Sequence, residues 1–252
     1  MAARTRLDGR GADTLRDVSV ETRVQRFPEG SVIYRCGNTR VLIAASVEEG
    51  VPDFVKGSGK GWITAEYAMH PRANPTRQRR EGQRGPVSGR TQEIQRLIGR
   101  ALRAAIHPEQ LGERTITLDC DVLDADGGTR TASITGGYVA LVMALDTLRK
   151  RGLCSKGVLR EPVAAVSIGL FQGSALLDLC YEEDRDTQVD LNLVATASGA
   201  IVEVQGTAEG APMTRAEHDA LLATGMVGIA RLIEVQKGAI DRLGIDLPRL
   251  FA

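Results

Sequence analysis

Runs in which apolar and polar side chains alternate predict nine β-strands along the chain. The clearest run covers residues 114–122, in which Ile116 and Leu118 lie on one face while threonine and aspartate side chains lie on the other. Two of the runs are separated by Gly37-Asn38-Thr39, which predicts a tight hairpin. The expected strands are 18–26, 31–36, 40–47, 62–67, 114–122, 162–170, 175–181, 189–196 and 200–205.

Three other segments repeat their apolar side chains at the spacing of an amphipathic helix. These helices are expected from Ser88 to Pro108, over 131–151, and from Thr214 through Ile233. Thr214 and Glu217 fit a capping box, which marks the start of the third helix. No linker, composition break or internal repeat divides the chain, so the pattern predicts one α+β domain over 1–252, with mixed sheets packed against helices.

The amino-acid composition is that of an ordinary soluble protein. Hydrophobic residues make up 42% of the chain and charged residues 25%, which is typical of a soluble globular protein. Aromatic residues are only 4%, which argues against a single-strand binder built on many stacking platforms. The start of the chain lacks an apolar run of the secretory kind, and no long apolar stretch indicates a membrane span. Four scattered cysteines favour free thiols, so we expect a cytoplasmic protein with no membrane partner.

Charge is distributed unevenly although the formal net charge is zero. Residues 70–87 combine prolines, glycines and arginines, which predicts a loop. Arginine without lysine favours bidentate recognition of phosphate groups, although a solvated, salt-bridged face is the alternative interpretation. Between Arg72 and Arg103 there are nine arginines and two acidic residues; the arginines are 72, 77, 79, 80, 84, 90, 96, 100 and 103.

Two helix starts carry an arginine beside glycine. Residues 126–131 read Asp-Gly-Gly-Thr-Arg-Thr between a strand and a helix, where glycines and helix N–H groups can approach an anion. Arg130 would add a full charge there, but a simple turn explains the same glycines. Arg90 opposes the dipole of its own helix, which is tolerable if an anion lies between them. A plain surface arginine is the alternative at that position.

A second unusual segment, 178–190, holds six acidic residues and one arginine. Asp184 and Asp190 flank the expected junction of strands 175–181 and 189–196, which we interpret as an acidic hairpin. Two carboxylates held close together either bind a cation such as Mg²⁺ or raise the pKa of one partner until it can donate a proton. An acidic turn without chemistry is the alternative.

The sequence closely resembles the ribonuclease PH family over nearly its whole length. The shared blocks, in order, are LDGR at 7–10, PEGSV at 28–32, KGWITAEY at 60–67, SGRTQEIQRLIGRALRA at 88–104, LGERTITLDCDVLDADGGTRTASITGG at 111–137, LLDLCYEED at 176–184, VDLN at 189–192 and EVQGTAEG at 203–210. The resemblance implies a single ribonuclease PH domain of the ribosomal protein S5 domain 2-like fold. It also implies a phosphorolytic 3′→5′ exoribonuclease that trims tRNA precursors and other RNA and releases nucleoside diphosphates, in a reversible nucleotidyltransfer.

The same resemblance assigns residues and partners. It implies phosphate binding by Arg90, Gly128, Thr129 and Arg130. It implies that Asp184 and Asp190 are the catalytic residues and the ligands of Mg²⁺ or Mn²⁺, with Asp178 as a third candidate. It implies that Arg72, Arg77 and Arg80 bind RNA and support ring assembly. The expected assembly is a homohexamer, a trimer of dimers, with inorganic phosphate as co-substrate.

The chain departs from the family pattern in the arginine-rich loop 70–87, where His70 replaces a more usual leucine and Arg79 is an additional basic residue.

Two other functions compete with the one that the resemblance implies. An inactive ring subunit would bind RNA without cleaving it, but such subunits lack part of the set Arg90, Arg130, Asp184 and Asp190. A small-molecule kinase would need a nucleotide-binding glycine loop, and 57–61 lacks the residues of a P-loop.

Overall fold

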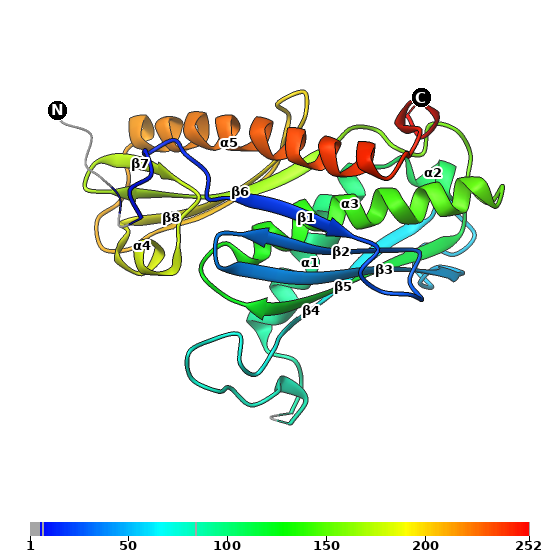
Figure 1. The fold of residues 1–252 in the computed structure, drawn as a ribbon, viewed down its shortest axis with the longest axis horizontal. Coiled ribbons are helices and arrows are strands. Elements are labelled where there is room, and N and C mark those ends of the chain that lie inside the picture. Colours follow the sequence, from blue (N-terminus) through cyan, green and yellow to red (C-terminus); the bar gives the residue numbers. More distant parts are fainter. Residues whose placement is uncertain (1–5, 7, 84, 252) are drawn as a thin grey trace.

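The described part of the chain forms two β-sheets with helices packed on them (Figure 1). The structure is a computed structural model, and it describes residues 6, 8–83 and 85–251. Its strands are β1 Val18–Thr22, β2 Gly30–Cys36, β3 Thr39–Glu49, β4 Trp62–Met69, β5 Arg114–Asp124, β6 Val163–Phe171, β7 Ser174–Leu177, β8 Val189–Thr196 and β9 Ile201–Ala208.

The first sheet has the strand order β1-β2-β3-β5-β4. Its neighbouring strands are antiparallel except β4 and β5, which run parallel. The hairpin expected at Gly37 is confirmed, because Cys36 pairs with Thr39 and Gly37 has a left-handed φ of 56°. The parallel pair matters for function, since β4 and β5 both lead into loops at the same edge of the sheet. These are the loop 70–88 and the loop before the helix that begins at Thr129.

The second sheet is antiparallel throughout, with the strand order β7-β6-β8-β9. Strands β6 and β8 are central, and nearly all of their side chains are buried. Side chains buried on both faces explain why these strands read as continuous apolar runs. Strand β9 is an edge strand, and most of its side chains are exposed or half-buried.

Helices complete both layers. They are α1 Gly89–Ala104, α2 Pro108–Leu111, α3 Thr129–Lys150, α4 Tyr181–Asp186 and α5 Arg215–Arg242, with the short 3-10 turns η1 Glu81–Gln83 and η2 Leu247–Arg249. Helix α3 packs against both sheets and is buried almost all around, while α5 covers the second sheet and α1 packs on β4 (Figure 1). Among the described residues, α3 is also the segment whose length and apolar composition would suit a membrane span. Its burial identifies it as the central core helix of this fold.

The α+β class expected from the sequence is confirmed, as are the three long helices and the loop over 70–87. That loop projects away from the two sheets between β4 and α1 (Figure 1). Two strands were predicted too long, namely 18–26, which ends as β1 at Thr22, and 175–181. The segment 175–181 forms strand β7 only as far as Leu177, and helix α4 begins at Tyr181. Six helical residues are too few to display a helical period, so the sequence pattern did not indicate α4.

Candidate active site

The start of α1 is held in place by hydrogen bonds from its first turn. Ser88 Oγ accepts from the N–H of Thr91 at 3.2 Å, which is the expected N-cap. The Ser88 and Thr91 hydroxyls both donate to Glu81 Oε1, at 3.0 and 2.8 Å. Glu81 therefore ties the projecting loop to the start of the helix. Arg90, the second residue of α1, leaves its side chain exposed at that start.

Two glycines before α3 adopt backbone conformations that other residues rarely take. Gly127 has a φ of 75° and Gly128, the N-cap, has a φ of 63°. A Cβ on Gly127 would lie 2.4 Å from the carbonyl oxygen of Leu179, so this loop packs directly on the turn that precedes α4. Gly128 provides no side-chain cap, which leaves the N–H groups of the first turn available to an anion.

Thr129 and Arg130 lie in that first turn, and each is oriented by a residue from another element. The hydroxyls of Thr129 and Tyr67, on β4, share a hydrogen bond of 2.9 Å. Arg130 Nη1 donates to Gln205 Oε1, on β9, at 2.7 Å. The sequence reasoning missed Tyr67 and Gln205, although both lie inside the shared blocks KGWITAEY and EVQGTAEG.

One cavity of about 1120 Å³ joins both helix starts to the acidic segment. It is lined by all of the expected phosphate-binding and catalytic residues, namely Arg90, Gly128, Thr129, Arg130, Asp184 and Asp190. Asp184 is on α4, and Asp190 is on β8. The structure therefore brings together two arginines from separate helices and two carboxylates from a third helix and a strand.

Burial and neighbouring charges shift the pKa values of the two carboxyl groups. Burial raises the pKa of Asp184 above its ordinary value, although the charges of Arg130 and Arg90 oppose the change. Burial and then the charge of Asp184 raise the pKa of Asp190 to about 6, against the same two arginines. Each carboxyl thus interacts with both guanidinium groups. Burial is the largest cause of both raised pKa values.

The acidic hairpin expected from the sequence is wrong in its geometry. Strands β7 and β8 are not neighbours, because β6 lies between them, and helix α4 intervenes in the chain. Within this segment the buried Glu183 receives hydrogen bonds from Arg6 Nε at 2.7 Å and from the N–H of Cys180 at 3.1 Å. These contacts fix α4 and leave Asp184 facing the cavity.

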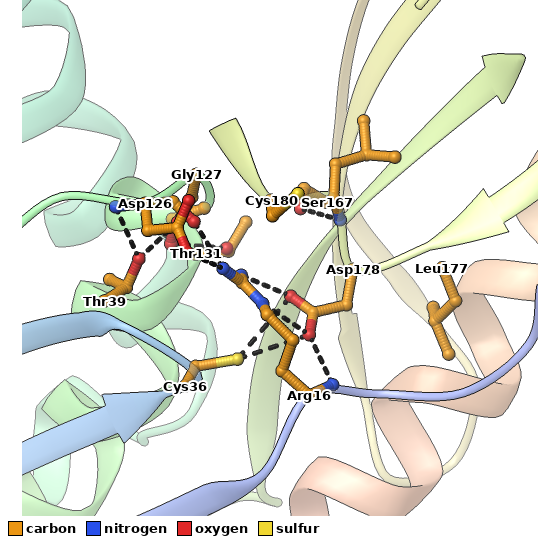
Figure 2. A network of polar contacts seen from close by, with 12 residues as sticks. Arg16, Cys36, Thr39, Asp126, Gly127, Thr131, Ser167, Leu177, Asp178 and Cys180 are labelled. Atoms are coloured by element: carbon orange, nitrogen blue, oxygen red, sulfur yellow. Dashed lines mark hydrogen bonds and ion pairs between the residues drawn. The ribbon is translucent and has the colours of Figure 1, made fainter. Parts of the chain in front are cut away.

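Asp178 belongs to a separate buried network, shown in Figure 2. Its carboxylate accepts from Arg16 Nη2 at 2.7 Å, Nε at 3.0 Å and the backbone N–H at 2.8 Å, and also from the Cys36 thiol. Arg16 Nη1 in turn donates to the carbonyl oxygen of Asp126, beside the glycine loop. Burial raises the pKa of Asp178, but its bonds with Arg16 outweigh burial and hold it below the ordinary value. Asp178 does not line the cavity, so its place is structural.

The loop arginines divide between the cavity and its surroundings. Arg80 and the additional Arg79 line the cavity, whereas Arg72 and Arg77 are exposed on the projecting loop outside the lining. The backbone N–H of Arg72 donates to His70 Nδ1 at 3.2 Å. Arg84 lies outside the described residues.

Two protein-family models match the chain. The RNase PH model described as 3′ exoribonuclease family, domain 1, matches residues 14–145, and the model for domain 2 of the same family matches residues 161–228. The chain belongs to the 3′ exoribonuclease family. The first family model covers the strands of the first sheet, and the second covers those of the second sheet. The sequence pattern predicted one domain over 1–252, and this domain assignment stays a prediction.

Two solved structures share the fold. Rrp46 from rice (Oryza sativa) aligns with a TM-score of 0.75 and 18% identity, over 93% of this chain and 100% of that one. A chain of the Archaeoglobus fulgidus exosome with RNA bound to the active site aligns with a TM-score of 0.74 and 23% identity, over 91% of each chain. At this level of identity the likeness concerns the fold alone.

Proposed function

We propose that the protein is ribonuclease PH, a phosphorolytic 3′→5′ exoribonuclease that trims the 3′ ends of tRNA precursors and other RNA. One observation carries the proposal: two arginines at separate helix starts line the same cavity as two carboxylates with raised pKa values. An RNA-binding subunit without activity would have no need of such a carboxylate pair. Perturbed pKa values of this kind cluster at catalytic sites.

Inorganic phosphate would bind at the start of α3. The N–H groups after Gly128 are free of side-chain caps, Thr129 adds a hydroxyl, and Arg130 adds a charge held by Gln205. Arg90 would contact the same anion from the start of α1. A phosphate there would also offset the unfavourable electrostatic interaction between the charge of Arg90 and the dipole of its own helix.

The reaction needs no nucleophilic side chain, because phosphate is itself the nucleophile. An oxygen of inorganic phosphate forms a bond to the phosphorus of the last linkage, and the bond from that phosphorus to the 3′ oxygen of the preceding nucleotide breaks. A nucleoside diphosphate leaves, and the 3′ oxygen takes up a proton. Arg90 and Arg130 neutralise the charge on the reacting groups, and Asp184 or Asp190 is placed to hold the proton.

A divalent cation fits the same carboxylates. Asp184 and Asp190 would hold Mg²⁺ or Mn²⁺, because both carboxylates are hard oxygen ligands and both line the same cavity. Among the described residues, no cluster of three His, Cys, Asp or Glu side chains could enclose an ion. Two carboxylates suit Mg²⁺, which usually keeps several waters and substrate phosphates as its other ligands. Such an ion supplies positive charge to the reacting phosphoryl group.

The projecting loop would bind RNA within a ring. Arg72, Arg77 and Arg80 are exposed there, and six copies in a homohexamer, a trimer of dimers, would surround the entrance with positive charge. Binding through these arginines should weaken steeply as salt rises. A protein that is monomeric by light scattering yet fully active on tRNA precursors would contradict the ring.

The products of RNA cleavage test the reaction directly. The protein is incubated with a 3′-extended tRNA, with and without inorganic phosphate, and the released nucleotides are separated. Nucleoside diphosphates that form only with phosphate are the expected result. Nucleoside monophosphates would mean hydrolysis, and RNA binding without any release would indicate an inactive ring subunit.

A further inference from the structure

Tyr181 is the exposed member of the chain's four tyrosines. Its exposed fraction is 59%, whereas Tyr34, Tyr67 and Tyr138 are all buried. An exposed aromatic ring on the surface of a cavity is a common contact for a ligand. Tyr181 also lines the cavity that contains the phosphate-binding and carboxylate residues.

The ring lies at a fixed place relative to those residues. Tyr181 is the first residue of α4 and precedes Asp184 by three positions, so both side chains lie on the same side of the helix. Its backbone N–H donates to Asp126 Oδ1 at 3.1 Å, in the loop that leads to Gly127 and Gly128. The tight contact of Gly127 with the carbonyl of Leu179 holds the same two segments together. The tyrosine is therefore tethered to the phosphate-binding loop.

We propose that Tyr181 stacks on the base of the 3′-terminal nucleotide, the one that is removed. This inference rests on the proposed function, because it assumes that the terminal linkage lies between Arg130 and Asp184. The base of that nucleotide then projects along the cavity wall that Tyr181 lines. An exonuclease that removes nucleotides one after another has to accept every base, and stacking on an aromatic ring is tolerant of sequence.

No second described aromatic residue is placed for this contact. The other aromatic residue in the cavity lining is Tyr67, which is 6% exposed and whose hydroxyl is bonded to Thr129. Phe27 and Phe54 are exposed, but neither lines the cavity. A single platform also agrees with the low aromatic content of the chain, 4%.

The test compares Tyr181→Ala and Tyr181→Phe on two RNAs that differ only at the 3′ end. One RNA has an ordinary terminal nucleotide, and the other has an abasic terminal nucleotide. Binding is measured by fluorescence anisotropy without phosphate, and KM values for RNA and for phosphate are measured by product release. Because the ring is exposed and its backbone N–H is unchanged, both variants should fold.

On ordinary RNA, Tyr181→Ala should weaken binding and raise the KM for RNA by about 5- to 100-fold, the range for loss of one stacked base. The KM for phosphate should not change, and Tyr181→Phe should resemble the unaltered protein. On abasic RNA, Tyr181→Ala and the unaltered protein should bind equally. An effect of Tyr181→Ala that persists on abasic RNA, or an equal effect of Tyr181→Phe, would overturn the proposal.

The binding measurement separates this inference from the proposed function. If the unaltered protein releases no nucleotide but Tyr181→Ala weakens the binding of ordinary RNA and not of abasic RNA, the stacking contact stands and the phosphorolytic activity fails. If nucleoside diphosphates form but Tyr181→Ala binds both RNAs as the unaltered protein does, or weakens the binding of both equally, the activity stands and the stacking contact fails.

Discussion

Gln205 on β9 and Arg130 on α3 are joined by a hydrogen bond of 2.7 Å, and the amide group of Gln205 also donates to Glu93 on α1. One glutamine thus connects the two helices whose first turns carry the site arginines. This arrangement fixes the guanidinium of Arg130 before any anion binds. Holding a charged group in its binding geometry lowers the ordering cost of binding.

Gln205→Leu should therefore weaken the use of phosphate. We expect the KM for phosphate to rise by about 3- to 10-fold, less than for complete loss of a hydrogen bond to a charged group, because water can partly replace the amide. The KM for RNA and the thermal stability should change little. Glu203→Gln, on the same strand and paired with Arg100, is the matched control and should leave both KM values unaltered. A similar phosphate effect from both variants would contradict the positioning role.

Removal of either carboxylate should abolish most of the activity without loss of RNA binding. Asp184→Asn or Asp190→Asn should lower the rate of nucleoside diphosphate release by about 10²–10⁴-fold, as expected for loss of a proton-transfer group. Asp186→Asn is the control, since Asp186 lies on the same helix, is exposed and pairs with Arg185. Full activity in the Asp184 or Asp190 variant would reject the assignment of that residue.

Gly127→Ala tests the packing of the phosphate-binding loop against α4. Gly127 and Gly173 have nearly equal φ values of 75° and 76°, but a Cβ would be obstructed only at Gly127. Gly173→Ala should therefore cost about 1 kcal/mol of stability from backbone strain and keep its activity. Gly127→Ala should lose more stability and most of its phosphorolytic activity. Urea denaturation and product release measure both effects, and equal outcomes in the two variants would show that the close contact is unimportant.

The buried pair of Arg16 and Asp178 should make stability depend on pH. The pKa of Asp178 lies below its ordinary value, so its contribution is present above the unfolded pKa, about 3.9, and is lost as the pH falls through the lower folded value. Asp178→Asn leaves Arg16 buried without its partner and should cost about 3–5 kcal/mol at pH 7.

Urea denaturation at several pH values checks this prediction. The difference in unfolding free energy between the unaltered protein and Asp178→Asn should shrink below about pH 4, because the carboxylate of the unfolded chain then begins to take up a proton while the folded one stays charged. Asp186→Asn serves again as the control, because Asp186 is exposed and pairs on the surface, where ion pairs contribute little. A difference that is constant with pH would show that the charge of Asp178 does not contribute.

Local sequence patterns predicted most of the fold and part of the site. Period-two and helical patterns indicated the strands and the long helices, because these elements have one apolar face or are wholly buried. Glycine and arginine at two helix starts predicted Arg90 and Arg130 from residue type alone, since anion binding at a helix start depends on local backbone geometry. Both arginines line the expected cavity.

Features that depend on tertiary contacts could not be predicted in this way. Asp178 lies in the same acidic segment of the sequence as Asp184 and Asp190, so residue type alone does not separate it from them. Its structural role depends on Arg16, which is 162 positions away in the sequence. Gln205 contacts Arg130 across 75 positions, and no local pattern indicates that pairing. The separation of β7 from β8 is likewise a property of sheet order, which the intervening β6 decides.

A crystal structure of the protein soaked in inorganic phosphate will show whether the two helix starts bind one anion. We expect one phosphate in the cavity, with Arg90 and Arg130 both within about 3 Å of its oxygens and backbone N–H groups at the start of α3 completing the contact. A phosphate bound by only one of these arginines, or a cavity that takes up no phosphate at saturating concentration, would contradict this expectation.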